Sequence, residues 1–371
     1  KPIDGHFPNG KGEALSDYIQ KGISTDHECS TLEEGEERCR QGMFVQIREG
    51  SAAKNFNALH PLIKEFPDKV MLCSDDIHPN TLLERHINGL VKRALDLGYD
   101  LYDVLRASSY NQAKHYGIPI GFLQEGDSAD FIIIDDLKAL NIKETFVKGK
   151  CIYNGKDIHF PAKEVVPINK FHAQPITMKE LEVKAISDMM RVIVCTDGNL
   201  DTSEEIVSPA VKEGMAISDT STDIIKIVVV NRYQKAPLSI GFIKGTGLKR
   251  GAVAQSITHD SHNIIAIGCT DEELATAINE VIVRQGGITV VNGTEINTLS
   301  LPIAGLLSPL SLDEIDATYR ILESKMQDLG STLSSLQMTL AFMSLLVIPS
   351  LKLGDKGLFN GDKFSFTTLF I

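Results

Sequence analysis

The sequence predicts an α/β protein of two or three domains, and three observations lead to that class. Hydrophobic residues make up 43% and charged residues 23% of the chain, which is typical of a globular protein with a sizeable buried core. Over residues 1–117, strand-like runs alternate with helical runs, the pattern of parallel strands joined by helices. The length of 371 residues exceeds that of one ordinary domain.

The first third of the chain contains four strand-like runs, each followed by a helical pattern. Lys1–Ile3 and residues 23–27 are short and compatible with β structure, residues 43–47 are β-branched and aromatic, and residues 70–73 are apolar. The spacing of apolar residues predicts the helices that follow the strands. These helices are 13–21, 32–41, 55–66, 82–97 and 101–116.

The pattern changes after residue 117. Glycines and short apolar runs over 118–160 predict a small β-module that is too small to fold alone, with strands at 131–134 and 145–153. A linker is expected over 161–175, and an α/β or α+β domain over 170–371. The predicted elements of that domain are strands at 224–230, 264–267 and 289–291, helices at 272–284 and 313–329, and a Met- and Leu-rich segment at 338–347.

Charge and cysteine usage exclude several classes of protein. Lys and Arg number 37 against 49 Asp and Glu, a net charge of −12, which argues against a nucleic-acid-binding surface. The longest apolar stretch is far short of the roughly 18 residues that a membrane helix needs. Six cysteines without a CxxC pair predict reduced thiols and a cytoplasmic protein. The chain has no initiator Met at Lys1, so we expect it to begin inside a longer protein.

Residues capable of chemistry follow each of the four strand-like runs. In a (β/α)₈ barrel the active site lies at the carboxyl ends of the strands, so this placement predicts one shared site. Two imidazoles and a carboxylate suit a divalent first-row metal, which lowers the pKa of a bound water and makes hydrolysis the predicted chemistry. The residues are His6, His27, Arg48 with Glu49, and Asp75 with Asp76.

Four motifs in this region carry a resemblance to a known family. They are Gly5-His6-Phe7-Pro8, Thr25-Asp26-His27-Glu28, Arg40-Gln41-Gly42-Met43 running to Arg48-Glu49-Gly50-Ser51, and Cys73-Ser74-Asp75-Asp76-Ile77-His78-Pro79. In order and spacing they resemble the later barrel strands of the bacterial adenine deaminases of the amidohydrolase superfamily. The segments 126–131 and 147–150 are similar to the small β-module that follows the barrel in that superfamily.

The second half of the chain extends the resemblance. Residues 247–252, 259–264 and 301–306 resemble the additional C-terminal domain that distinguishes adenine deaminases from dihydroorotase-like relatives. The implied fold is the back half of a metal-dependent hydrolase barrel of the TIM type over 1–117, the β-module over 118–160, and the adenine deaminase C-terminal domain over 170–371. The family's first His-x-His pair and its bridging acidic ligand would lie upstream, so the resemblance implies N-terminal truncation.

The resemblance also implies an activity and a metal. The activity is hydrolytic deamination of adenine to hypoxanthine and ammonia, with adenine as the small-molecule partner. His6 and His27 are implied as metal ligands, and Asp75 as both ligand and proton-transfer group. The implied metal is Mn²⁺ or Fe²⁺, in a site that is binuclear in the full-length protein. We also expect a homo-oligomer.

The roles of several neighbouring residues stay open. Adjacent residues of a strand point to opposite faces, so we expect Asp75 to enter the barrel mouth and Asp76 to reach the substrate from the loop. Glu28 is either a proton donor to a purine ring nitrogen or a loop-capping carboxylate.

Arg48 and Glu49 make a structural ion pair or orient the substrate, with Ser51 as a loop cap. Glu49 and Ser51 remain candidates for substrate binding, as do His259 and His262, which we expect in a polar loop that closes over the active site.

Two alternatives remain at this stage. A hydrolase of cyclic amides, such as dihydroorotate or hydantoins, would use the same metal shell, although the C-terminal half disfavours it. A catalytically inactive remnant is the other, because half a barrel leaves sheet edges open. For the same reason we expect the isolated chain to aggregate or to need its missing segment.

Overall fold

The computed structural model describes residues 1–51, 53–160 and 166–371. The chain forms two compact units, Lys1–Glu164 and Val165–Ile371. The sequence-based division at 117, 160 and 170 stays a prediction, and the first residues of the expected linker, 161–165, lie outside the described residues. In the described ranges, every helix is too short or too polar to span a membrane.

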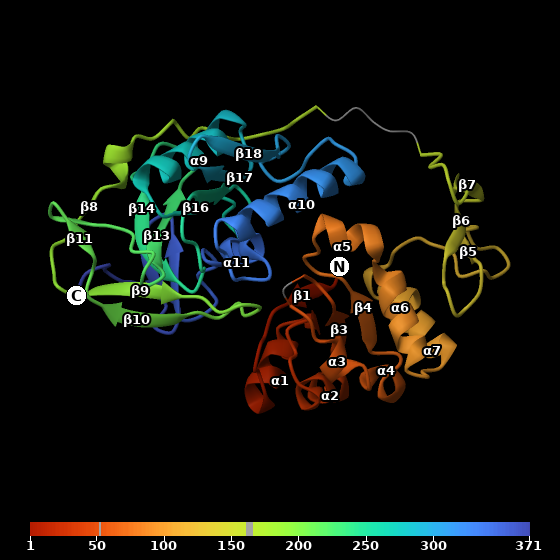
Figure 1. Cartoon of the computed structure of the whole chain (residues 1–371). Helices are drawn as coiled ribbons and strands as arrows, with labels where there is room; N and C mark the ends of the chain where they lie inside the picture. The colour runs from red at the N-terminus through yellow and green to blue at the C-terminus, as the bar shows by residue number, and fades with distance from the viewer. Residues whose placement is uncertain (52, 161–165) are drawn as a thin grey trace. The chain divides into compact units, whose positions relative to one another are not determined.

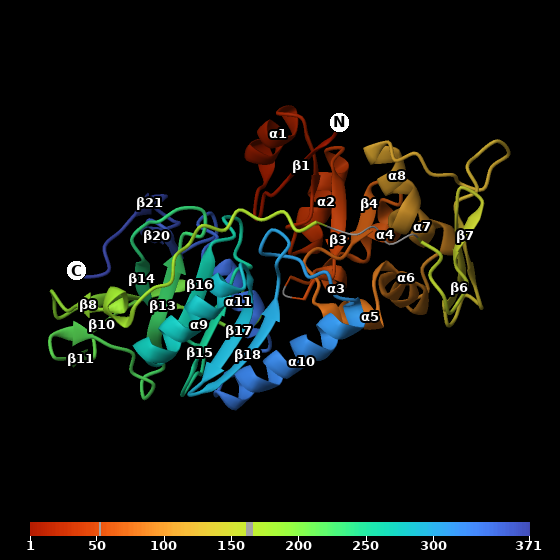
Figure 2. The same cartoon turned by 90° about the horizontal axis from the view of Figure 1, so that it is seen from above.

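A four-stranded parallel sheet forms the centre of the first unit (Figures 1 and 2). Its order is β1-β2-β3-β4, so strands adjacent in sequence are adjacent in space, and each pair is parallel. This confirms the predicted alternation of strands and helices. The strands are β1 Ile3–Gly5, β2 Ile23–Asp26, β3 Phe44–Arg48 and β4 Val70–Cys73.

The helices of the first unit are shorter than the sequence pattern predicts. The predicted helix 55–66 is broken before Pro61, which has no backbone N–H to continue a helix. The predicted helix 82–97 is interrupted at His86, whose backbone N–H donates to the Asn88 side chain. The helices are α1 Gly12–Gln20, α2 Leu32–Arg40, α3 Phe56–Leu59, α4 Leu62–Glu65, α5 Pro79–Glu84, α6 Ile87–Asp96, α7 Leu101–Leu105, a π-helical turn Arg106–Tyr110, and α8 Asn111–Tyr116.

One face of the parallel sheet carries the core of the first unit. Val45 and Ile47 alternate with more exposed neighbours along β3, as expected for side chains on opposite faces of a strand. Together with residues of β4 they pack against the helices that follow the strands. The helical members of this cluster include Leu59, Leu62, Ile63, Leu90, Ala94 and Val104.

Side chains of α8 bond to the backbone of β4, the last strand in the sheet order. Asn111 Nδ2 donates to the carbonyl oxygen of Val70 at 2.7 Å, and Gln112 Nε2 donates to that of Leu72 at 3.1 Å. An end strand presents unpaired backbone groups that invite association with other strands. These two amides therefore satisfy carbonyls at the place where the sequence predicts exposed backbone.

The predicted short strands after residue 117 form a separate antiparallel sheet. Its order is β5-β6-β7, and Phe131 stacks on Phe146 across the first pair with ring centroids 4.7 Å apart. The strands are β5 Phe131–Ile134, β6 Ile142–Val147 and β7 Lys150–Tyr153.

The second unit is built on an eight-stranded sheet of order β10-β9-β14-β13-β16-β15-β17-β18. All neighbours are antiparallel except β9 and β14. The predicted strands 224–230, 264–267 and 289–291 are present in this sheet. The strands are β9 Met190–Val194, β10 Ser203–Val207, β13 Ile224–Val230, β14 Ser239–Lys244, β15 Ala252–Gln255, β16 Ile264–Gly268, β17 Gly287–Asn292 and β18 Glu295–Ser300.

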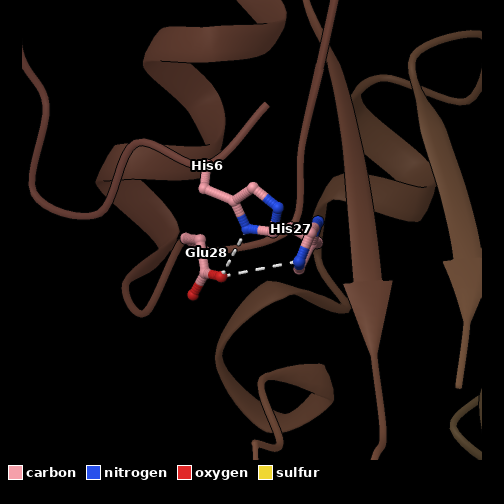
Figure 3. Close-up of side chains that lie close together, drawn as sticks. All are labelled: His6, His27 and Glu28. Carbon is pink, nitrogen blue, oxygen red and sulfur yellow. Dashed lines mark hydrogen bonds and ion pairs between the residues drawn. The ribbon is translucent and has the colours of Figure 1, made fainter. Parts of the chain in front are cut away.

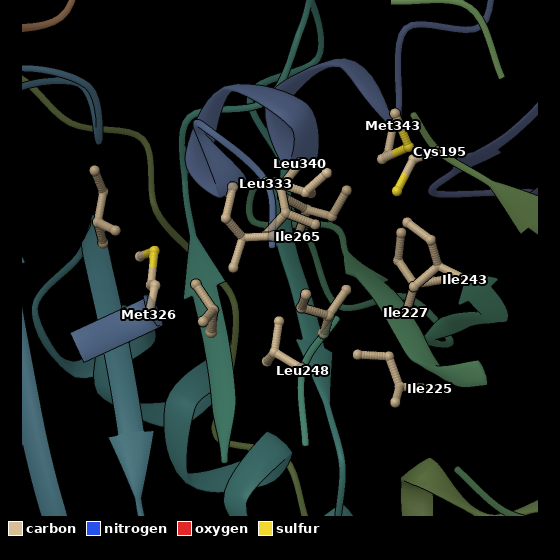
Figure 4. Packing of buried hydrophobic residues seen from close by; sticks show 14 of the residues in the cluster. Cys195, Ile225, Ile227, Ile243, Leu248, Ile265, Met326, Leu333, Leu340 and Met343 are labelled. Atoms are coloured by element: carbon tan, nitrogen blue, oxygen red, sulfur yellow. The ribbon is translucent and has the colours of Figure 1, made fainter. Parts of the chain in front are cut away.

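Both faces of the large sheet are covered, so its central strands are buried and mostly apolar, and the buried Lys226 of β13 is paired with Asp271. Ile225 and Ile227 of β13 lie in a cluster with residues of α10 and α11, whereas Val228 lies in a cluster with residues of α9. Figure 4 shows the first of these clusters, with Ile225 and Ile227 beside Ile243. The helices are α9 Asp271–Val283, α10 Leu312–Asp328 and α11 Leu336–Phe342.

The sequence prediction omits β9, β14, β15 and β18 as well as β10, and for β10 the reason is that its sequence lacks an apolar run. β10 reads Ser-Glu-Glu-Ile-Val and pairs with β9 at the end of the sheet, where its residues are exposed or half-buried. The remaining short elements are the 3₁₀ turn Met178–Leu181, β8 Val183–Lys184, β11 Val211–Lys212, β12 Met215–Ala216, β19 Leu351–Gly354, β20 Gly357–Asn360 and β21 Ser365–Phe366.

A buried ion pair connects α2 to the parallel sheet. Arg38 Nε lies 2.5 Å from Asp26 Oδ2, and both side chains are fully buried. Arg38 Nη2 also donates to the carbonyl oxygen of Phe7, and Asp26 Oδ1 accepts from the backbone N–H of Glu28 at 2.9 Å. The pair therefore links the loops that follow β1 and β2.

We expect Asp26→Ala to lower the free energy of unfolding of the first unit by about 3–5 kcal/mol, because it leaves the Arg38 charge buried without a partner. The double variant Asp26→Leu/Arg38→Met removes both charges and should cost less than the single variant. Urea unfolding followed by circular dichroism measures the loss, and hydrogen exchange of residues 26–47 assigns it to this unit. A double variant less stable than Asp26→Ala would contradict the argument.

Candidate metal centre

The chemistry-bearing residues of the first unit gather at the carboxyl ends of its parallel strands. His6 follows β1, His27 and Glu28 follow β2, and Arg48 is the last residue of β3. Asp75 comes two residues after the end of β4. Because all four strands run in the same direction, these positions lie at one edge of the sheet, as the sequence predicts.

One oxygen of the Glu28 carboxylate reaches a nitrogen of each imidazole (Figure 3). Glu28 Oε1 is 3.1 Å from His6 Nδ1 and 3.4 Å from His27 Nε2. The centroids of the two imidazole rings are 4.5 Å apart. In the described part of the chain, these three residues form the one group of three or more His, Cys, Asp or Glu side chains with the proximity to hold a metal ion.

Two donor separations in this group suit a divalent metal, and all three donor atoms lie within 4.8 Å of one another. Donor atoms that share one ion at bond lengths of about 2.1 Å lie about 3.0–3.4 Å from each other. The two distances from Glu28 Oε1 fall in this range. Nitrogen and oxygen donors without a thiolate suit first-row divalent ions.

Asp75 lies beside the group but outside it. Its Oδ2 atom is 3.9 Å from His27 Nε2 and 2.5 Å from Arg48 Nη1. Its backbone has a φ of 57°, and its Oδ1 atom accepts from the Asp76 backbone N–H at 3.0 Å. The expectation that Asp75 and Asp76 point to opposite faces of a strand is therefore wrong. β4 ends at Cys73, and Asp75 lies in a loop with a left-handed backbone conformation.

Arg48 and Glu49 both form ion pairs, with different partners. Arg48 Nη2 donates to Glu28 Oε2 at 2.7 Å, and Arg48 Nη1 donates to Asp75. Glu49 is buried and pairs with Arg93 Nη1 at 3.0 Å. Arg48 thus contacts the candidate metal ligands, whereas the Glu49 carboxylate is paired with Arg93 of α6.

Ser51 joins the loop after β3 to the loop after β4. Its Oγ atom accepts from the backbone N–H of His78 at 2.9 Å, and its own N–H donates to the Asp76 carbonyl oxygen at 2.7 Å. Both bonds agree with the loop-capping role considered from the sequence. Substrate binding by Glu49 and Ser51 stays a prediction.

The electrostatics of the group favour the protonation states that bind metal. Burial is the largest influence on His27 and lowers its pKa, although Glu28 and Asp75 act in the opposite direction. Burial alone would raise the pKa of Glu28, but Arg48, a hydrogen bond from His6 and the nearby His27 together hold it below its usual value. A neutral imidazole and an ionised carboxylate are the forms that coordinate a divalent ion.

Two residues that sequence reasoning missed hold the site loops in place. Arg38 links the loops after β1 and β2, as described above. Asn55 accepts from the Arg48 backbone N–H at 2.8 Å, and its Nδ2 donates to the carbonyl oxygens of His27 and Cys29. Arg38 leaves a sequence signal, because α2 is so poor in apolar residues that its buried face must include polar ones. Asn55 leaves no such signal.

His259 and His262 belong to the second unit, in the loop between β15 and β16. Their rings are 6.3 Å apart, and His259 stacks on Phe342 of α11 with ring centroids 4.4 Å apart. The His259 backbone N–H donates to the Ala341 carbonyl oxygen at 2.9 Å. The loop is therefore packed against α11 within its own unit, and its role in substrate binding stays a prediction.

Comparison with known proteins places both halves of the chain. Residues 1–152 match the model of the amidohydrolase family, and residues 199–365 match that of the adenine deaminase C-terminal domain. The chain is 57% identical over its whole length to an adenine deaminase of Parabacteroides distasonis, covering 68% of that protein. It is 48% identical to an adenine deaminase of Methanosarcina mazei, covering 69%, and 46% identical to one of Salinibacter ruber, covering 68%. In both cases the match includes the whole of this chain.

Among solved structures, a β-aspartyl dipeptidase from Fervidobacterium islandicum-AW-1 aligns with 44% of this chain and 48% of its own. The sequence identity is 21% and the TM-score is 0.36, a likeness too weak to bear on the fold.

His78 makes the stability of the first unit depend on pH. Burial lowers the pKa of His78 from its ordinary 6.5 to about 4, so the unfolded chain binds a proton in the window between these values and the folded chain does not. His78 therefore contributes to the free energy of unfolding. This contribution is fully present above pH 6.5 and is lost as the pH falls through about 4, and it amounts to at most roughly 3 kcal/mol.

We therefore expect His78→Gln to flatten the rise in melting temperature between about pH 4 and 6.5. Calorimetry of both proteins across this range measures the difference. Parallel pH profiles for the two proteins would show that His78 titrates alike in both states.

Proposed function

The chain belongs to the adenine deaminases of the amidohydrolase family, and from this membership we propose that it catalyses the hydrolysis of adenine to hypoxanthine and ammonia. The observation that supports this most directly is the meeting of His6, His27, Glu28 and Asp75 at one edge of a parallel sheet. We also propose that this sheet is part of a TIM-type barrel, whose active sites lie at that edge.

The proposed metal ligands are His6 and His27, with Asp75 as the third ligand implied by the resemblance. The contacts of Glu28 Oε1 with both imidazoles support Glu28 as a further ligand. A divalent ion held there would lower the pKa of a bound water, so that a nucleophile is available near neutral pH. We propose Mn²⁺ or Fe²⁺, in agreement with the nitrogen and oxygen donors. The second ion of the proposed binuclear site would need donors beyond this group.

Asp75 is the proposed proton carrier. Its carboxylate lies 3.9 Å from His27 Nε2, within reach of a water molecule shared with the group. It can accept the proton that water loses and pass it to the departing amine. Without that proton the amine would leave as an amide ion, which is a very poor leaving group.

Substrate contacts are proposed for residues of each unit. Asp76, next to Asp75, is the candidate that faces the purine. Proton donation from Glu28 to a ring nitrogen is the less favoured role, because Arg48 and the two histidines hold the Glu28 pKa below its usual value. Ser51 and Glu49 are further candidates in the first unit, where Arg93 holds the Glu49 carboxylate. His259 and His262 are candidates in the second unit. The match of residues 199–365 to the adenine deaminase C-terminal domain favours adenine over cyclic amides as substrate.

The assembly and location of the protein are also proposals. All six cysteines are free thiols, which supports a reducing compartment and hence the cytoplasm. A homo-oligomer remains our expectation.

Removal of the Asp75 charge tests the mechanism. Asp75→Asn keeps the size of the side chain but removes the base, so turnover should fall by at least ~10²-fold to 10⁴-fold. Bound metal should decrease as well, since a ligand charge is lost. Asp76→Asn should change turnover less and act mainly on KM for adenine. Ammonia release and metal content of the full-length protein provide both measurements.

The matched control is Asp96→Asn, which removes an exposed carboxylate paired with Lys92 on α6. It should behave as wild type. Activity near wild type in Asp75→Asn would refute the proposed mechanism, whereas a collapse confined to Asp76→Asn would exchange the roles of the two aspartates.

A further inference from the structure

We propose that Arg48 is a positioning residue and the built-in counter-cation of the metal centre, holding the Glu28 and Asp75 carboxylates in place at the expense of weaker metal binding. This inference rests on the proposed function, because it assumes that the cluster of His6, His27 and Glu28 binds a divalent ion.

The Arg48 guanidinium bridges the two carboxylates. Its Nη2 atom is 2.7 Å from Glu28 Oε2, and its Nη1 atom is 2.5 Å from Asp75 Oδ2 and 3.5 Å from Glu28 Oε1. The Arg48 side chain is only 10% exposed. A planar guanidinium donates in several directions at once, so one side chain can fix two carboxylates.

The bridge determines which oxygen of Glu28 faces the imidazoles. Oε2 is held by Arg48, and Oε1 is left 3.1 Å from His6 Nδ1 and 3.4 Å from His27 Nε2. The carboxylate cannot rotate without giving up the Arg48 contact. Arg48 therefore positions the Glu28 carboxylate mainly through Oε2, with a longer contact of 3.5 Å to Oε1.

Arg48 is itself anchored at its backbone. Its N–H donates to Asn55 Oδ1 at 2.8 Å, and its carbonyl oxygen accepts from the Asn55 N–H at 3.1 Å. It also pairs with Cys73 in the register between β3 and β4. The Arg48 side chain thus extends from a backbone position that the sheet and Asn55 hold in place.

The charge of Arg48 acts against the metal in two ways. A cation bound to the same carboxylates repels a divalent ion directly. It also makes the carboxylates weaker donors, because their negative charge is already partly compensated. Without the metal, the same charge separates two like-charged groups that would otherwise repel each other across a half-buried site.

The test uses Arg48→Met and Arg48→Lys in the full-length protein, with Mn²⁺ as the probe. Arg48→Met should bind Mn²⁺ about tenfold more tightly than wild type, because the competing charge is gone. The metal-free variant should melt at a lower temperature than metal-free wild type, and saturating Mn²⁺ should remove most of that difference. Turnover of adenine should fall, because the carboxylates lose their orientation.

Arg48→Lys separates charge from geometry. It keeps the positive charge, so Mn²⁺ affinity should stay within a few-fold of wild type, but an ammonium group cannot bridge both carboxylates as a planar fork does and turnover should still fall. The control is Arg40→Met, which removes an exposed arginine paired with Glu36 on α2 and should leave Mn²⁺ affinity unchanged.

The outcomes distinguish this inference from the proposed function. Equal or weaker Mn²⁺ binding by Arg48→Met, with a melting deficit that Mn²⁺ does not reduce, would overturn the role of Arg48 as counter-cation. Wild-type protein that binds Mn²⁺ but releases no ammonia from adenine would instead overturn the proposed function, and the Mn²⁺ titrations would still decide the role of Arg48.

Discussion

One buried guanidinium, that of Arg38, holds together the two loops that carry the histidines. It pairs with Asp26, the residue before His27, and donates to the carbonyl oxygen of Phe7, the residue after His6. Since neither charged side chain reaches water, separation of the loops would take the Phe7 carbonyl away from a buried guanidinium and leave one of its N–H donors without this partner. The spacing of the two imidazoles therefore depends on a residue of α2 that touches neither of them.

The other neighbouring loops are joined in the same manner, by a polar side chain that bonds to the backbone of the next loop. Asn55 connects the end of β3 to the loop after β2, and Ser51 connects the loop after β3 to the loop after β4. Gly50 permits the second connection, because a Cβ at this position would lie 2.8 Å from the Asp76 carbonyl oxygen. The ends of parallel strands expose unpaired backbone groups, and these side chains satisfy them while setting the distances within the site.

This arrangement explains which parts of the site a sequence can predict. His6, His27 and Asp75 are predictable because their positions follow from local patterns, a strand-like run followed by a polar residue, and from the common direction of parallel strands. The bridging role of Arg48 and the position of Glu28 depend on rotamers and loop conformations that no local pattern encodes. The positive φ of Asp75 is of the same kind, since it places the carboxylate where strand alternation does not.

In the second unit, β13 is predictable from its buried and mostly apolar sequence. β10 has no such sequence, and it forms a strand because it pairs with β9.

The charges of the site suit the reaction proposed for it. Glu28 and Asp75 carry two negative charges and Arg48 one positive charge, so these three groups leave one net negative charge to attract a divalent cation. With that cation present the balance becomes one net positive charge, which favours a water-derived nucleophile over neutral water at the same position. Adenine is itself uncharged, so its binding depends on shape and on hydrogen bonds around the cluster. A second arginine would make the metal-free site electrically neutral and weaken its attraction for the ion, while the loss of Arg48 would strengthen that attraction and release the carboxylates. One bridging cation between two carboxylates thus reconciles metal recruitment with a fixed catalytic geometry.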